Sequence, residues 1–441
     1  MEPARLQTEI KQNERNRTRW VLTWVLLVLA GAYFLARGPF RYSMSTSWND
    51  LTQYYASSRL WLRGQNFAKP TNFVALWRDE VGGILGADTM RTHIAPPPGA
   101  LVLFAPIGAL PWWAARVVWL AVLVGAFLLA VWALIRTAGF RLNEPRTIAF
   151  IAGCLALAPF HTGIAGANQT VLVVAFCAAG IWAASQARDL LAGVLFGAAC
   201  SLKPHIAAFL VLYYLVRGRW RLFFTSVAFT LFLVSVAAGW MQINGVDWSH
   251  DYFNNIRFGS TRNTIDDFTS ANPIRFMLIN LQVPFYSFTR NAKSSNLLAL
   301  GIGLLLISVW MVLVLRTRKQ TIQLLPLAAI AVIGLLPLYH RFYDASVLAI
   351  VLCWCVTWPA GQLRLVAKGA LLLMAAFLIP GTAVLQQAAT HGHVPNSWIN
   401  SWWWDRVVMP HQTWLLLLLS LLLLYGMALQ ALGANHQPTV L

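Results

Sequence analysis

The feature of this sequence that most limits its fold is the alternation of long apolar runs with short basic clusters. Residues 114–135, 222–240 and 297–315 each reach about the 17 residues that a helix needs to cross a bilayer. Clusters rich in arginine and lysine, such as residues 316–319, separate these runs. Inside a membrane only helices and closed barrels satisfy their backbone hydrogen bonds. The pattern therefore predicts an all-α polytopic membrane protein.

The composition supports this class and argues against a soluble chain. Of the 441 residues, 58% are hydrophobic and 11% are charged, whereas a soluble domain carries about 25% charge. A net charge of +18 would suggest nucleic-acid binding in a soluble protein, but here the basic residues stand between apolar runs. We therefore interpret them as topology signals and contacts with anionic membrane lipids, and we expect no nucleic-acid partner.

The positive-inside rule orients the predicted helices. It places the basic residues 1–19 in the cytoplasm, followed by a single transmembrane unit over residues 20–432 and a cytoplasmic tail at 433–441. The first span is predicted at residues 20–36. About twelve spans with both termini inside agree with the charge clusters. Three large loops then lie on the outer side, at residues 37–113, 241–296 and 387–411.

Residues 190–216 admit two interpretations, either one kinked helix or two short helices broken at residues 203–205. A single helix would place the basic residues 217–221 outside, against the positive-inside rule. A hairpin places them inside and Lys203 outside. The charges therefore favour the hairpin.

The stretch after the first predicted span, residues 47–66, contains a candidate catalytic residue. Asp50 is a carboxylate at a membrane face, where an acid is costly unless it is solvated or paired. Tyr54, Tyr55 and Trp61 follow at helical spacing, which predicts an amphipathic helix lying at the membrane interface. Aspartate also favours helix N-caps, so a purely structural role for Asp50 stays open.

The predicted topology gathers acids, cations and histidines at the outer face. Arginine and lysine pair with phosphate oxygens, and a carboxylate can take a proton from a hydroxyl. This combination suits an anionic, phosphate-bearing lipid head. The residues are Asp50, Arg91, His93, Asn168, Gln169, Lys203, His205, His340 and Asp344. Lys203-Pro204 could also be no more than a loop between two helices. His391 and His393 lack further ligands, so we predict no metal site.

Four segments also carry recognisable motifs. They are NDLTQYYASSRLWLRGQN (49–66), THIAPPPGALVLFAPIGALP (92–111), GANQTVLVV (166–174) and LLAGVLFGAACSLKPHIAAFLVLYYLVRGRWR (190–221). Together they resemble glycosyltransferase family 87, of the C-type glycosyltransferase superfamily, and the last block is the most specific. LYHRFYD (338–344) is also similar. The sequence departs from the family pattern at Thr52-Gln53, and residues 241–296 match no motif, so the acceptor stays open.

The resemblance implies a C-type glycosyltransferase fold and an inverting hexosyltransferase. Such an enzyme would take its sugar from a polyprenyl phosphate and pass it to a lipid or glycan acceptor. The chain is similar to mycobacterial members that are mannosyltransferases acting on phosphatidylinositol mannosides, so we expect an α-mannosyltransferase. We further expect a multi-pass monomer in a bacterial inner membrane, with a periplasmic active site and no cofactor.

The resemblance also suggests roles for individual residues. Asp50 matches the family's catalytic acid and would be the general base. Lys203, together with Arg91 or His340, would hold the donor phosphate. The remaining residues expected to bind substrate are Tyr54, His93, Asn168, Gln169, His205 and Asp344.

Two functions of other classes compete with glycosyl transfer. A transporter or flippase for lipid-linked glycans would favour charges on both faces and pseudo-symmetric halves, whereas this sequence predicts a one-sided rim. A non-catalytic membrane assembly subunit would not need Asp50.

Overall fold

The computed structural model describes residues 2–45, 50–81, 95–259, 264, 266–317 and 324–434. In chain order, the elements are α1 (Glu2–Leu35), η1 (Ala36–Phe40), α2 (Arg41–Met44), α3 (Asp50–Leu62), α4 (Pro70–Leu76), η2 (Trp77–Val81), α6 (Pro98–Gly108), α7 (Trp112–Ala138), α8 (Pro145–Ala156), α9 (Ala158–Ala165), α10 (Thr170–Ser185), α11 (Asp189–Leu202), α12 (Pro204–Val216), α13 (Trp220–Ile243), α14 (Ser249–Gly259), η3 (Arg275–Met277), α15 (Gln282–Thr289), α16 (Ala292–Arg316), α17 (Leu324–Gly334), η4 (Phe342–Val347), α18 (Leu348–Val356), α19 (Leu363–Met374), η5 (Ala375–Phe377), α20 (Gly381–Thr390), α21 (Asn396–Ile399), η6 (Trp404–Val408) and α22 (His411–Ala434).

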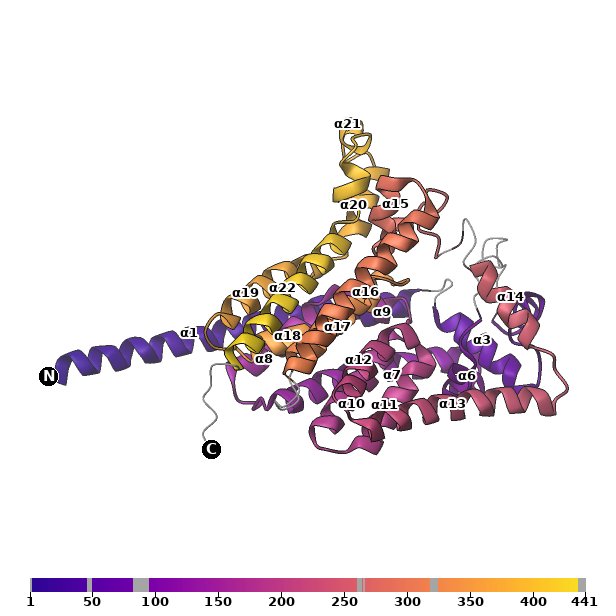
Figure 1. The fold of residues 1–441 in the computed structure, drawn as a ribbon, viewed down its shortest axis with the longest axis horizontal. Coiled ribbons are helices and arrows are strands. Elements are labelled where there is room, and N and C mark those ends of the chain that lie inside the picture. The colour runs from indigo at the N-terminus through magenta and orange to yellow at the C-terminus, as the bar shows by residue number, and fades with distance from the viewer. Residues whose placement is uncertain are drawn as a thin grey trace.

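The described chain is helical and contains no strand, which confirms the predicted all-α class. Figure 1 shows α1 projecting from one side of the molecule. The C-terminal helices α16, α19 and α22 slant together toward α15, α20 and α21 at one end, and α10 to α13 lie beneath them. The elements α3, α6 and α14 lie on the side away from the N-terminus (Figure 1).

Within the described residues, six helical segments are long and apolar enough to cross a membrane. They are Trp20–Met44, Trp112–Ala138, Trp220–Ile243, Ala292–Arg316, Leu363–Thr390 and His411–Leu432. The pair α8 and α9, bent by 46°, makes a seventh if it is one span. Shorter apolar helices of 10–17 residues among the described residues are α6, α10, α11, α12, α17 and the continuous pair η4–α18. The protein is thus a polytopic membrane protein, and the count of about twelve spans stays a prediction.

The first span ends later than the sequence suggested. The helix does not stop at Ala36 but continues through the π-helical turn η1 into α2 and ends at Met44. Proline normally interrupts an α-helix because it lacks an N–H group, and here Pro39 lies inside the wider π-helical turn. Gly38 permits a close approach to α9, because a Cβ atom there would lie 3.2 Å from the Cβ of His161.

The predicted interfacial helix after Asp50 is instead buried. Most residues of α3 are inaccessible, including the polar Thr52 and Ser58. The Tyr55 hydroxyl donates to the Leu110 carbonyl (3.0 Å), and the Trp61 indole N–H donates to the Ala237 carbonyl (3.0 Å). The helical spacing was correct, but the interfacial placement was wrong. The bonds of Tyr55 and Trp61 to other segments, and the bond of the Ser58 hydroxyl to the Tyr55 carbonyl within α3, satisfy these polar groups and allow the helix to be enclosed.

The predicted hairpin at residues 190–216 is confirmed. Lys203 is non-helical (φ −144°, ψ 84°) and separates α11 from α12. Arg219, just after α12, donates from its Nε atom to the Asp189 carboxylate at the start of α11 (3.2 Å). The start of α11 and the end of α12 therefore lie together, which requires the chain to reverse at Lys203.

The α11 helix packs closely against α13 through two glycines one turn apart. A Cβ atom on Gly193 would lie 2.5 Å from the Thr225 Cβ, and one on Gly197 would lie 2.7 Å from the Ser226 carbonyl oxygen. Small residues at four-residue spacing commonly allow such close contacts between membrane helices. This contact fixes the hairpin that contains Lys203.

Two of the predicted outer loops pack against each other. Phe276, Leu278 and Val283, from residues 241–296, share a small apolar core with Trp404 and Met409, from residues 387–411. Nearby, Arg275 pairs with Asp405 at 2.9 Å. These contacts form the end of the molecule around α15 and α20 (Figure 1).

We predict that Gly197→Ala destabilises the protein by about 1–3 kcal/mol, because the added methyl group overpacks the α11–α13 contact. Gly239→Ala is the matched control, because a Cβ there meets nothing within 4 Å. The Gly239→Ala substitution should leave the stability of the protein unchanged or raise it by up to about 1 kcal/mol. Thermal unfolding of the purified proteins gives the comparison. Equal midpoints for the two variants would contradict the close packing.

Candidate active site

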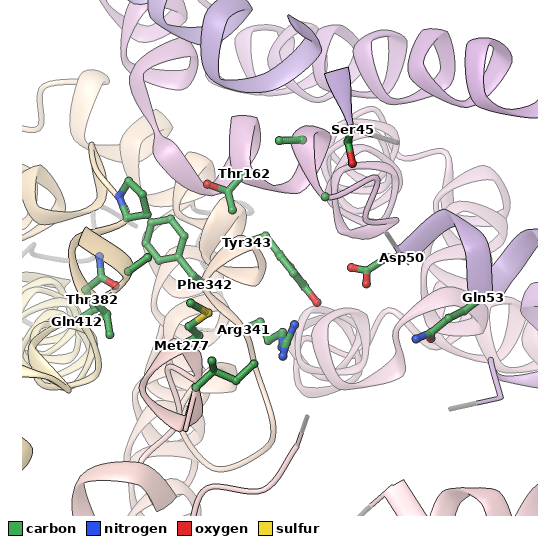
Figure 2. Close-up of a pocket in the computed structure, with 15 residues that line it drawn as sticks. Ser45, Asp50, Gln53, Thr162, Met277, Arg341, Phe342, Tyr343, Thr382 and Gln412 are labelled. Atoms are coloured by element: carbon green, nitrogen blue, oxygen red, sulfur yellow. Dashed lines mark hydrogen bonds between the residues drawn. The ribbon is translucent and has the colours of Figure 1, made fainter. Parts of the chain in front are cut away.

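A pocket of about 460 Å³ lies where the N-terminus of α3, the end of α9 and the start of η4 meet. Figure 2 shows Asp50, Arg341 and Tyr343 directing their polar groups toward its polar end, with Phe342 and Met277 beyond them. Its lining residues are Ser45, Asp50, Gln53, Thr162, Ala165, Gly166, Ile274, Met277, Arg341, Phe342, Tyr343, Pro380, Thr382, Ala383 and Gln412. The pocket therefore joins a charged half to an apolar half.

Asp50 begins α3 and is held by the turn that follows α9. Its backbone N–H donates to the Gly166 carbonyl (3.1 Å), and its Oδ2 accepts a hydrogen bond from the Asn168 side-chain amide. Ala167, between these two partners, has a left-handed backbone (φ 56°) that turns the chain sharply. Asp50 remains partly exposed. If Asp50 served only as the N-cap of α3, its carboxylate would not need the hydrogen bond from Asn168, which belongs to another segment.

Asn168 and Thr170 connect Asp50 to a buried acid. The Asn168 Oδ1 accepts from the Thr170 backbone N–H (2.8 Å) and lies 2.6 Å from the Thr170 hydroxyl. The same hydroxyl lies 2.7 Å from Oδ1 of Asp344. A hydroxyl carries one proton, so it donates to one of these oxygens at a time. The polar chain thus runs from the pocket into the protein.

Asp344 is fully buried and collects donors from several segments. The Lys203 ammonium lies 2.7 Å from its Oδ1, while its Oδ2 accepts from the Arg341 backbone N–H (2.9 Å) and lies 3.3 Å from His340 Nδ1. Burying a charge is costly unless it is paired and hydrogen-bonded, and these contacts meet that condition. The bond to Arg341 also fixes the start of η4. Asp344 therefore orients the residue that precedes η4.

Arg341 is a pocket residue that the sequence prediction did not name. Its side chain lies at the polar end of the pocket with Asp50 (Figure 2). Burial disfavours its charge, but the surrounding Tyr339, Tyr343 and acidic groups more than offset this and raise its pKa above the ordinary value. A guanidinium so placed suits a phosphate. The sequence offered one indication of this role, because Arg341 directly follows His340 in the LYHRFYD segment.

The structure places Lys203 and His340 behind the pocket wall. Lys203 is 6% exposed, and its ammonium lies 4.7 Å from the centre of the Tyr343 ring, which itself lines the pocket. His340 is fully buried. Neither residue lines the pocket. Their contact with the donor phosphate remains a prediction. Arg341, unlike these two residues, lines the pocket.

The other predicted substrate-binding residues fall into three groups. Asn168 contacts Asp50 directly, whereas Gln169 donates to the Tyr54 hydroxyl one layer behind, where both side chains are buried. His205 and Asp344 belong to the cluster around Lys203. The remaining two, Arg91 and His93, lie outside the described residues. The sequence did not indicate a site role for Gln53, Thr162 and Tyr343, which line the pocket.

One group within the described residues has the composition of a metal site. His205, His340 and Asp344 each bring one ligand atom within 4.8 Å of the others. The Lys203 ammonium already pairs with Asp344 there, and its positive charge opposes a cation. The donor set therefore fits an internal ion-pair cluster better than a metal centre.

The sequence profile of glycosyltransferase family 87 matches residues 96–337, more than half of the chain. The matched part includes Asn168 and Lys203 and ends shortly before Arg341. No curated protein and no solved structure matches the chain.

We predict that Lys203→Met lowers stability by about 3–5 kcal/mol, because it leaves the Asp344 carboxylate buried without its partner charge. Lys368→Met, at an exposed position, should change stability little. A Lys203→Met/Asp344→Asn double variant should recover part of the loss. Thermal unfolding measures all three. A Lys203→Met protein as stable as the parent would contradict a structural role for this pair.

Proposed function

The chain belongs to glycosyltransferase family 87. From this premise we propose that the protein is an inverting hexosyltransferase. It takes its sugar, mannose, from a polyprenyl phosphate. The acceptor is a lipid or glycan hydroxyl. We place the reaction at the periplasmic face of a bacterial inner membrane, in a single domain with about twelve spans. The distribution of basic clusters supports this orientation.

The observation that supports this proposal most strongly is that Asp50 and Arg341 line the same pocket. A base and a cation are what transfer from a phosphate-linked sugar requires. Beyond them, the pocket continues between Ile274, Met277 and Phe342, an apolar surface that suits the prenyl chain. The donor phosphate would lie at Arg341, with the sugar between it and Asp50.

In the proposed reaction, Asp50 removes the proton from the acceptor hydroxyl. The acceptor oxygen then forms a bond to the sugar C1 on the face opposite the phosphate, and the C1–O bond to the phosphate breaks. The electron pair leaves with the polyprenyl phosphate, whose charge Arg341 stabilises. Asn168 donates to Oδ2 of Asp50, so we assign Oδ1 as the base. A β-linked donor gives an α-linked product.

The cluster behind the pocket has a supporting part in this proposal. Lys203 and His340 hold Asp344, which fixes the backbone of Arg341. We also propose that five further residues contact the substrates, namely Tyr54, His93, Gln169, His205 and Arg91.

We predict that Asp50→Asn folds normally but loses about a hundredfold or more in turnover, the scale of a general base. Asparagine keeps the size of the side chain and an oxygen that can accept from Asn168, so packing should not change. The measurement is transfer of labelled mannose from synthetic polyprenyl-phosphate mannose into a lipid extract of the source membranes, beside a thermal unfolding curve.

Asp79→Asn is the matched control for this experiment. Asp79 is exposed, pairs with the neighbouring Arg78 and does not line the pocket. Its variant should transfer sugar like the parent. Turnover of Asp50→Asn within a few fold of the parent would remove Asp50 from the mechanism, whereas absence of transfer by the purified parent would favour an assembly subunit. Donor translocation without glycosyl transfer would instead indicate a transporter.

We predict that Arg341→Gln lowers turnover by roughly ten- to a hundredfold, because a lost hydrogen bond to a charged group costs about 1.5–3 kcal/mol. The loss should appear in kcat/KM for the donor. Arg406→Gln is a control, since this guanidinium donates to the Trp402 carbonyl and does not line the pocket. An unchanged donor kcat/KM in Arg341→Gln would show that Arg341 does not act on the phosphate.

A further inference from the structure

A short helix in the predicted outer loop 241–296 has an exposed apolar pair that the proposed transfer chemistry does not use. This helix, α14, begins six residues after the end of the candidate membrane span formed by α13. Its Phe253 and Ile256 side chains are 60% and 41% exposed. Single exposed apolar residues are common on protein surfaces, so the surroundings of this pair decide what it means.

Another face of α14 is fixed to the protein. Oδ1 of Asn255, a buried residue, accepts a hydrogen bond from the Ala95 N–H (2.6 Å). Oδ2 of Asp251, one turn earlier, accepts a hydrogen bond from the Asn66 side-chain amide (2.7 Å). These two contacts set the rotation of α14 about its own axis. The exposed pair is therefore held away from the protein and does not reach the surface by chance.

The depth of α14 relative to α13 follows from a shared apolar core. Trp248, just before α14, and Tyr252 pack against a core that contains Ala237 and Met241, from the last turns of α13. Trp240, in the same part of α13, is 39% exposed, and tryptophan is enriched where a membrane meets water. We therefore expect α14 to lie at the depth of the membrane–water interface on the outer side.

The exposed apolar surface of α13 extends to the same depth. Leu231, Phe232 and Ile243 of α13 are 59%, 58% and 82% exposed, as expected for a span that faces lipid. Figure 1 shows α14 near the far end of α13 and steeply inclined to it. If α13 crosses the bilayer, α14 therefore runs along the bilayer surface. Lipid that covers α13 as far as Ile243 thus reaches the level of the exposed pair.

The polar side chains of α14 complete the pattern of an interfacial helix. His250 and Arg257 are exposed and stand three and four residues from Phe253, so they adjoin it on the helix surface. An apolar face beside a basic polar face is typical of helices that lie in a membrane interface. Arginine suits this position, because its aliphatic part can contact the apolar layer while its charge stays among the headgroups.

We propose that α14 is an interfacial helix that inserts Phe253 and Ile256 into the outer leaflet of the membrane. The partner is phospholipid, whose acyl chains receive the apolar pair and whose headgroups meet His250 and Arg257. The sequence predicted an interfacial helix at α3, which is buried, and predicted only an outer location for the loop that contains α14. This inference does not depend on the donor or the acceptor of the proposed reaction.

Photo-crosslinking of the full-length protein in phosphatidylethanolamine–phosphatidylglycerol nanodiscs tests the proposal. p-Benzoyl-phenylalanine, which attaches to nearby C–H bonds on illumination, replaces Phe253, Ile256 or the exposed Asn254, one position at a time. Leu231, on the exposed side of α13, is the reference position. Mass spectrometry measures the fraction of each protein that carries a phospholipid acyl chain. We expect adducts at positions 253 and 256 close to the level at position 231, and several-fold fewer at position 254.

The outcomes are independent of the transfer assay. Adducts at positions 253 and 256 as rare as those at position 254 would overturn the inference, because the whole exposed face would then meet water. Crosslinks from position 253 to a second copy of the chain instead of lipid would also overturn it, since the apolar pair would then belong to a protein interface. The same lipid adducts are expected in Asp50→Asn, so a failure of the proposed function leaves this result unchanged.

Discussion

The buried ion pair between Lys203 and Asp344 is the interaction on which the arrangement of the pocket depends. A carboxylate with no solvent exposure is tolerable only when donors surround it. Those donors come from the break between α11 and α12, from α10 and from the segment before η4. Satisfying one anion therefore ties three distant parts of the chain together. The same contacts orient Arg341 and, through Thr170 and Asn168, the carboxylate of Asp50.

The arrangement of charge in and behind the pocket suits the proposed transfer from a lipid-linked sugar. Asp50 and Arg341 face the pocket, where a proton and a phosphate would be handled, whereas Lys203 and His340 lie behind its wall. Lys203 and Asp344 form a neutral pair, and Asp344 accepts a hydrogen bond from the backbone N–H of Arg341. In the proposed reaction, the buried cluster thus supports the guanidinium that meets the substrate.

The segment from Pro337 to Tyr343 carries Arg341 to the pocket. Its pairing with residues 278–282 needs only a few backbone hydrogen bonds, yet it fixes the position of Arg341. Ile274 and Met277, from the predicted outer loop 241–296, line the same pocket, so this loop forms part of the candidate site and is not merely a connection.

The sequence by itself determined the all-α membrane class, because apolar runs and basic clusters report directly on the cost of charge in lipid. It also determined the reversal at Lys203-Pro204, through proline and the charge rule, and it brought Asp50 and Asn168 to attention. Only the tertiary structure decided that α3 is buried, that Lys203 pairs with Asp344, and that Arg341 lines the same pocket as Asp50. Burial and pairing depend on which segments meet, and a local pattern cannot specify a partner 141 residues away.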